Sequence, residues 1–139
     1  MRLYWRMVHP RTRGALVAMW NERKLLLVRN SYVRYHSLPG GYVRRGETGR
    51  AAAARELFEE TGIRAEPLEL KLALVERHAW EGKREEIEIF EIEVVEQPVV
   101  NVDNREVERA GFFDLQEALA LHLYPPVRKL IAGRLAARQ

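Results

Sequence analysis

Three glutamates stand close together in the stretch RELFEETGI, at Glu56, Glu59 and Glu60. If this stretch is helical, Glu56 and Glu60 lie one above the other, with roughly 5–6 Å between their Cβ atoms. Like charges at this spacing destabilise a helix, and the macrodipole disfavours anions near its C-terminal end. Two interpretations follow: a solvated acidic face in which Arg55 pairs with Glu59, or a site for a cation.

The residues before the helix favour the cation. Hard divalent cations such as Mg2+ bind carboxylate and carbonyl oxygens and keep several waters. Glu56 and Glu60 supply stacked carboxylates, and Glu59 flanks them. The glycine turn in SLPGG can bring a backbone carbonyl, that of Gly40, to the same point. A metal ion there would relieve the repulsion between the acids and would bridge to a phosphate.

The helix itself is expected from Thr48, as N-cap, to about Thr61, with Gly62 as a left-handed C-terminal cap. At about 100° per residue, the three glutamates and Ala52 share one arc, which we expect to face solvent. The opposite arc is expected to be buried and consists of Ala51, Ala53, Ala54, Leu57, Phe58 and Thr61.

Apolar runs, alternation and turn residues predict the other elements. Strands are expected at 14–20, 24–30, 42–45, 68–79 and 85–95, with turns or irregular segments at 21–23, 31–41 and 80–84. Residues 105–115 read as strand or turn and lead into LQEALAL, and an amphipathic helix follows Pro125 and Pro126. The order of strands, helix, strands and helix predicts an α/β fold with a mixed sheet covered by helices.

Composition narrows the class of protein. The 139 residues predict one domain, 1–139, and 47% hydrophobic with 31% charged residues is typical of a soluble globular protein. The absence of cysteine excludes thiolate chemistry. No apolar run is long enough for a membrane span, and the N-terminus lacks a signal-peptide pattern, so we expect a cytoplasmic protein. The net charge of +3 would favour phosphorylated substrates, but arginine greatly outnumbers lysine, so compositional bias is the stronger interpretation. The basic residues are scattered, which disfavours nucleic-acid binding.

Residues 41–63 fit the Nudix box, G-x5-E-x7-R-E-U-x-E-E-x-G-U with U aliphatic, at every specified position. The matching residues are Gly41, Glu47, Arg55, Glu56, Leu57, Glu59, Glu60, Gly62 and Ile63. The preceding SLPGG is also usual in that family. The chain therefore resembles the Nudix hydrolases over about a sixth of its length, and the flanking strands and late helix look like the rest of that domain.

The resemblance implies an α/β/α sandwich with a mixed β-sheet between helices. It implies an enzyme that hydrolyses a nucleoside diphosphate linked to another moiety, with Mg2+, or Mn2+ as a substitute, binding the pyrophosphate and activating water. The metal site carried over from the family consists of Gly40, Glu56, Glu59 and Glu60, with Glu59 acting directly or through water. Arg55 would orient the glutamates, Glu47 would pair with Arg55, and Gly41 would allow the tight loop.

The general base varies in this family. We expect Glu106, because EVERAGFF resembles the segment where related enzymes place a glutamate before an aromatic strand. Glu85, Glu86 and Glu88 are rivals, and Glu56 could serve as base itself. The catalytic set is then Glu56, Glu59, Glu106 and Arg55.

Substrate contacts lie outside the box. The residues chosen for them are Arg29 and Arg44 for phosphates and Tyr35 for stacking on a base. Further candidates of the same kinds are Arg34, Arg45, Tyr32 and Trp80. Each could equally be an ordinary surface residue. The alternative function is a non-catalytic nucleotide sensor or RNA-associated module, which the intact acidic set disfavours. Many relatives form dimers, so a homodimer is one expected state.

Overall fold

The computed structural model describes residues 11–80, 82–103 and 106–137. The strands are β1 (Arg11–Asn21), β2 (Lys24–Asn30), β3 (His36–Ser37), β4 (Gly40–Tyr42), β5 (Lys71–Trp80), β6 (Lys83–Glu93) and β7 (Val107–Asp114). The helices are α2 (Gly49–Thr61), the 3-10 turn η1 (Pro67–Glu69), α3 (Leu115–Leu119) and α4 (Pro125–Ala137). No helix in the described ranges has the length and apolar character needed to cross a bilayer.

The strands form one mixed sheet in the order β3-β2-β1-β6-β5, with β4 paired to β1 and β7 paired to β2. β1 and β6 are parallel, and the other pairs are antiparallel. The apolar run 14–20 is continuous because β1 is buried on both faces. Ala15, Val17 and Met19 enter one core, and the alternating residues Leu16, Ala18 and Trp20 enter the other.

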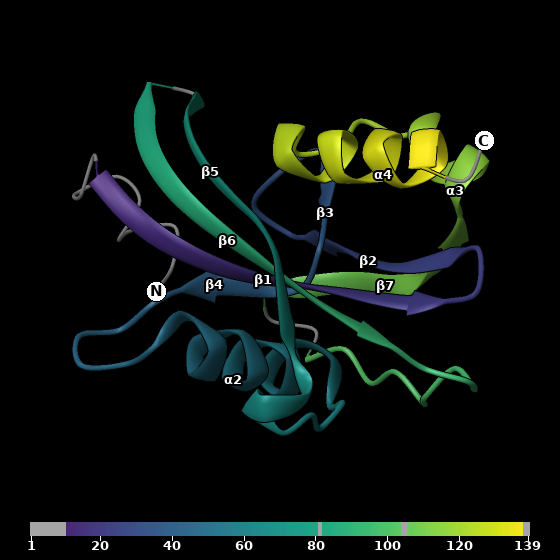
Figure 1. Cartoon of the computed structure of the whole chain (residues 1–139), viewed down its shortest axis with the longest axis horizontal. Coiled ribbons are helices and arrows are strands. Elements are labelled where there is room, and N and C mark those ends of the chain that lie inside the picture. The colour runs from purple at the N-terminus through teal and green to yellow at the C-terminus, as the bar shows by residue number, and fades with distance from the viewer. Residues whose placement is uncertain (1–10, 81, 104–105, 138–139) are drawn as a thin grey trace.

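Each face of the sheet is covered by helices (Figure 1). α2 packs Ala53 and Leu57 into the core shared with Val17 and Met19. α4 packs Val127 and Ile131 into the core on the other face. The expected α/β/α sandwich with a mixed sheet between helices is confirmed.

The caps of α2 are those that the sequence predicts. The Thr48 hydroxyl accepts a hydrogen bond from the Ala51 N–H at 3.1 Å. Gly62 is left-handed, with φ 74°, and its N–H donates to the Phe58 carbonyl. The helix is therefore fixed at both ends, which also fixes its register against the sheet.

The expected burial of the helix is wrong at four positions. Phe58 is 41% exposed, although the helical wheel put it on the buried arc. Glu56 and Glu60, expected to face solvent, are only 4% and 1% exposed, and Ala52 beside them is fully buried. The reason is that β4 packs along this side of α2, so the backbone of β4 covers the acidic arc.

The predicted bounds differ from the structure in several places. β4 spans Gly40–Tyr42 rather than 42–45, because Gly40 and Gly41 themselves pair with Leu16 and Ala15 of β1. The segment expected to be irregular contains the short β3. β5 begins at Lys71 because residues 67–69 form the 3-10 turn, and β5 and β6 extend into the connection expected at 80–84.

Gly62 at the end of α2 and Gly133 within α4 test whether the backbone conformation at each position requires glycine. An alanine at Gly62 keeps ordinary contacts, since its Cβ would lie 3.5 Å from Asn101 Cβ, but must hold φ 74°. We expect Gly62→Ala to lower the free energy of unfolding by about 1–2 kcal/mol. Gly133, in the middle of α4 with open space around it, should behave oppositely, and Gly133→Ala should stabilise by about 0.5–1 kcal/mol. Urea denaturation measures both, and equal signs would contradict this account.

Candidate functional site

Arg55 is the centre of a hydrogen-bond network at the acidic arc. It donates to both Glu47 carboxylate oxygens, at 2.8 and 2.9 Å, and to Glu56, Glu59 and the Tyr42 carbonyl at 3.1 Å each. A guanidinium has five N–H donors, so this set uses its full capacity. The bidentate contact with Glu47 raises the pKa of Arg55 above its usual value and lowers the pKa of Glu47. Both groups are held in their charged forms.

Glu56 and Glu60 are buried carboxylates one helical turn apart. Glu56 accepts from Arg55, and Glu60 Oε1 accepts from the Gly40 N–H at 3.0 Å. A Cβ on Gly41 would collide with the Glu56 carboxylate, so only glycine lets the β4 backbone approach this closely. Two buried like charges side by side are costly unless a positive group compensates them.

The donor chemistry at this point suits a hard divalent cation. Two buried carboxylates lie beside a backbone turn, and hard oxygens are what Mg2+ and similar ions bind. Glu59, with 45% of its side chain exposed, turns outward to Arg55. Within the described ranges, no group of three or more acidic, histidine or cysteine side chains is close enough to enclose a metal ion. Glu56 and Glu60 are thus both buried one helical turn apart, whereas Glu59 is partly exposed and contacts Arg55.

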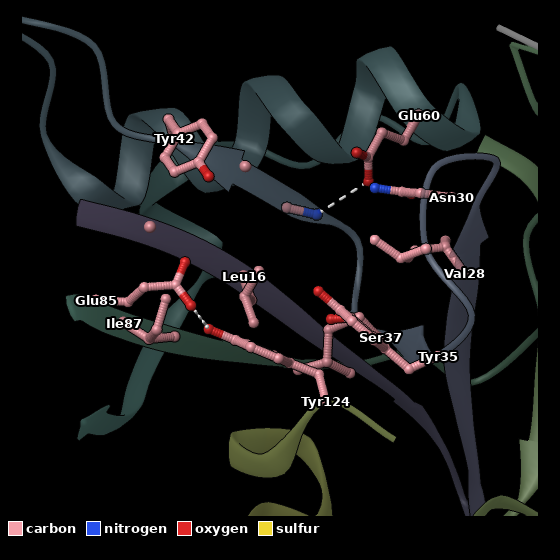
Figure 2. A pocket seen from close by; sticks show the side chains of 15 residues that line it. Leu16, Val28, Asn30, Tyr35, Ser37, Tyr42, Glu60, Glu85, Ile87 and Tyr124 are labelled. Carbon is pink, nitrogen blue, oxygen red and sulfur yellow. Dashed lines mark hydrogen bonds between the residues drawn. The ribbon is translucent and has the colours of Figure 1, made fainter. Parts of the chain in front are cut away.

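A pocket opens beside these carboxylates (Figure 2). Glu60 and the Gly40 N–H lie on one side of it, and Glu85 and Tyr124 lie on the other. Apolar side chains, among them Leu16 and Ile87, form its wall between the two polar ends. A concave site with a few polar groups on apolar walls is the usual form of a small-molecule site.

The family model for the NUDIX domain matches residues 10–133. The chain belongs to the NUDIX family. A curated relative, the putative 8-oxo-dGTP diphosphatase of Bacillus subtilis, is 39% identical over 74 residues, which are 52% of this chain and 49% of that protein. The chain therefore spans about half the length of the curated relative that it matches.

Solved NUDIX structures share the fold. The MutT protein of Methanosarcina mazei superposes with a TM-score of 0.77 at 24% identity, over 94% of this chain and 97% of that one. An Ap4A hydrolase of C. elegans superposes with a TM-score of 0.74 at 20% identity, over 91% and 98% of the two chains. At such identities the similarity shows only that the fold is shared.

In this NUDIX chain, the glutamates outside the box that were considered as general base occupy different surroundings. Glu85 is 6% exposed, lines the pocket and accepts from Tyr124. Glu86 and Glu88 pair with arginines, Glu86 with Arg77 at 3.0 Å and Glu88 with Arg13 at 3.3 Å.

Glu106 stands next to the strand end that borders the pocket. Its carbonyl accepts from the Ser31 N–H at 2.7 Å, and the next residue, Val107, pairs with Asn30. Asn30 lines the pocket near Glu60 (Figure 2). The backbone of Glu106 is therefore brought to the rim, about fifty residues along the chain from the box.

The residues expected from sequence to contact the substrate also differ in their surroundings. Tyr35 lines the pocket, but its ring stacks on Tyr124, with centroids 5.7 Å apart. Arg29 lies on the other side of β2 from the pocket residues Val28 and Asn30, with Nε 3.7 Å from Glu108.

The remaining candidates are not in the pocket lining. The N–H of the exposed Arg44 donates to Glu47, so this residue helps to close the loop before α2. Tyr32, Arg34 and Arg45 are exposed. The Trp80 side chain lies outside the described part of the structure.

Sequence reasoning missed Tyr124, Asn30 and Ser37, which line the pocket. Tyr124 had a usable signal, because an aromatic residue directly before two prolines marks the fixed start of a helix. Asn30 and Ser37 had none, since each reads as an ordinary polar residue at a strand end.

Proposed function

We propose that this NUDIX protein is a metal-dependent pyrophosphohydrolase. Its substrate would be a nucleoside diphosphate linked to another moiety, such as a further phosphate, a nucleotide or a sugar. The observation that carries the proposal is the buried pair Glu56 and Glu60, oriented by Arg55 and Gly40 at the edge of a pocket. Mg2+ is the proposed ion, with Mn2+ as a substitute, because the ligands available are hard oxygens.

The chain's own residues have distinct parts in the proposed reaction. Glu56 and Glu60 would hold the ion, with Glu59 assisting directly or through water and the Gly40 carbonyl completing the site. Arg55 fixes the Glu56 carboxylate by a charge-assisted hydrogen bond, and Glu47 in turn fixes Arg55. When bound, Mg2+ would neutralise charge on the phosphate oxygens and lower the pKa of its water.

Glu106 is the proposed general base. It would accept the proton as water attacks a phosphorus atom, and the bridging P–O bond would break to release two phosphate-bearing products. No covalent enzyme intermediate is required. The nucleoside would bind in the pocket that Glu60 lines. The relatives named for 8-oxo-dGTP and Ap4A support a nucleotide as the substrate class.

The direct test is product detection with a panel of nucleoside triphosphates, dinucleoside polyphosphates and nucleotide sugars in the presence of Mg2+. Hydrolysis of an anhydride bond in at least one of them is the expected result. Tight binding of nucleotides without any product would overturn the proposal in favour of a sensor. Function as a single domain over 1–139, a cytoplasmic location and a homodimer stay predictions.

Metal binding should be visible in stability as well. A ligand that binds only the folded state stabilises it by about 2.7 kcal/mol at a hundredfold excess over its Kd. We expect Mg2+ to raise the Tm, because it compensates the two buried carboxylates. The Glu56→Gln/Glu60→Gln double variant should lose that increment while remaining folded in metal-free buffer. If wild type and double variant gain equally in a thermal melt, the ion binds elsewhere.

A further inference from the structure

The buried carboxylate of Glu85 has no part in the proposed chemistry. It is 6% exposed on β6 and lies across the pocket from Glu60 (Figure 2). The Tyr124 hydroxyl donates to its Oε1 at 2.7 Å. Burial of a carboxylate is unfavourable unless hydrogen-bond donors satisfy it, and the Tyr124 hydroxyl is one such donor. A ligand that brings N–H groups to this end of the pocket would add charge-assisted hydrogen bonds.

The carboxylate is held in a fixed position. Tyr124 is 5% exposed, and its ring stacks on Tyr35 at an interplanar angle of 18°. Ile87, two residues along β6, lines the apolar wall next to it. A rigid acceptor on an apolar wall discriminates between ligands by the donors that they present, because an unmatched acceptor at the contact is penalised.

The two polar ends of the pocket suggest an orientation for a bound nucleotide. Phosphates belong at the Glu56 and Glu60 end if the proposed function is right, which leaves the base for the Glu85 end. Polar groups of Ser37 and Asn30 line the pocket as well, and Asn30 Oδ1 is buried without a hydrogen bond among the described residues.

We propose that Glu85, positioned by Tyr124, reads the base of the substrate and selects a guanine-type edge. This inference rests on the proposed function. Guanine places a ring N–H and an amino group side by side, so one carboxylate can accept from both. Adenine and cytosine present an amino group next to a bare ring nitrogen, and uracil presents its N–H between two carbonyls. Each of these sets an acceptor against the carboxylate. Oxidation at C8 of guanine leaves the selected edge unchanged.

The test measures binding without metal, so that it does not depend on catalysis. Kd values are measured by calorimetry for GMP, IMP, AMP and UMP. We expect GMP to bind about 10–100-fold more tightly than AMP or UMP, and IMP, which lacks the amino group, to lie between them. Glu85→Gln should abolish most of this preference, because the N–H of the glutamine amide would face an N–H donor of guanine. Binding of the four nucleotides within threefold of each other by wild type overturns the inference.

Two further variants separate base reading from general damage. Tyr124→Phe keeps the stacked ring but removes the hydroxyl, and we expect it to reduce the GMP preference with less effect than Glu85→Gln. It also serves if Glu85→Gln fails to fold. Glu93→Gln makes the same chemical change on the exposed part of β6, where Glu93 pairs with Arg134, and should keep the wild-type preference. An unchanged preference in both Glu85→Gln and Tyr124→Phe contradicts the inference.

The outcomes for the inference and for the proposed function are distinct. Hydrolysis of nucleotides together with equal Kd values would leave the pyrophosphohydrolase in place and remove the role of Glu85. A GMP preference that depends on Glu85, with no hydrolysis of any nucleotide, would support recognition of the base by Glu85 and would contradict the proposed hydrolase activity.

Discussion

Glu60→Gln should abolish most of the hydrolytic activity and leave the fold intact. The substitution removes one charge from a pair of buried carboxylates, and the amide oxygen can still accept the Gly40 N–H. Loss of a charged metal ligand should cost several kcal/mol of transition-state stabilisation, which is a thousandfold or more in rate. Steady-state kinetics at saturating Mg2+ measure the loss, and the Tm of the metal-free variant should equal or exceed that of wild type.

The control for this variant is Glu93→Gln, which removes the same charge at an exposed position of β6. Its activity should stay within about twofold of wild type. Near-normal turnover of Glu60→Gln at saturating Mg2+ would remove Glu60 from the metal site. A strong loss of Tm would instead mean that Glu60 is needed for the packing of β4 against α2.

Local sequence signals were sufficient for most of the framework. The apolar run 14–20 predicts a strand, and Thr48 and Gly62 predict the ends of α2. These features depend on neighbours in sequence. The bounds of β4 depend instead on pairing with β1, and a pairing partner 25 residues away leaves no mark on the glycines themselves.

The burial of the acidic residues could not be predicted from a helical wheel. The wheel orders the residues of α2 around its axis and carries no information about which neighbours cover each side. The glycines of β4 cover Glu56 and Glu60, whereas Phe58 is left exposed beneath the guanidinium of Arg64, 4.3 Å from the ring centre. The proposed metal site nevertheless rests on the spacing of the charges, because repulsion between Glu56 and Glu60 can be recognised from sequence alone.

The pocket was the least predictable part of the site. Its lining comes from β1, β2, β3, β4, α2 and β6, from the connections on either side of β3, and from Tyr124 just before α4. Pairing of Arg55 with Glu47 follows from the box, but Tyr124 reaches Glu85 over 39 positions of sequence. Arg29 and Arg44 were chosen for charge only, and the alternation of β2 and the loop before α2 turn them to other partners.

Glu106→Gln should lower kcat by roughly 10²–10⁴, the usual scale for loss of general acid–base catalysis. The Asp103 carboxylate accepts from the N–H groups of Glu106 and Val107, at 3.3 and 3.0 Å, and fixes this segment beside Ser31 at the pocket rim. KM and Mg2+ affinity should change little, because proton transfer contributes to the transition state and not to ground-state binding. Steady-state kinetics over a Mg2+ titration measure all three quantities.

The same titration distinguishes a base from a ligand. If Glu106 binds the metal, the variant should need more Mg2+ for half-maximal rate, and high Mg2+ should partly restore kcat, because mass action refills a weakened site. The rate lost with a general base cannot be restored in this way, since added metal does not replace a proton acceptor. Rates within about twofold of wild type at every Mg2+ concentration would exclude both roles. The base would then be sought at Glu85, which lines the pocket, or at Glu56 in the box, because Glu86 and Glu88 are paired with arginines.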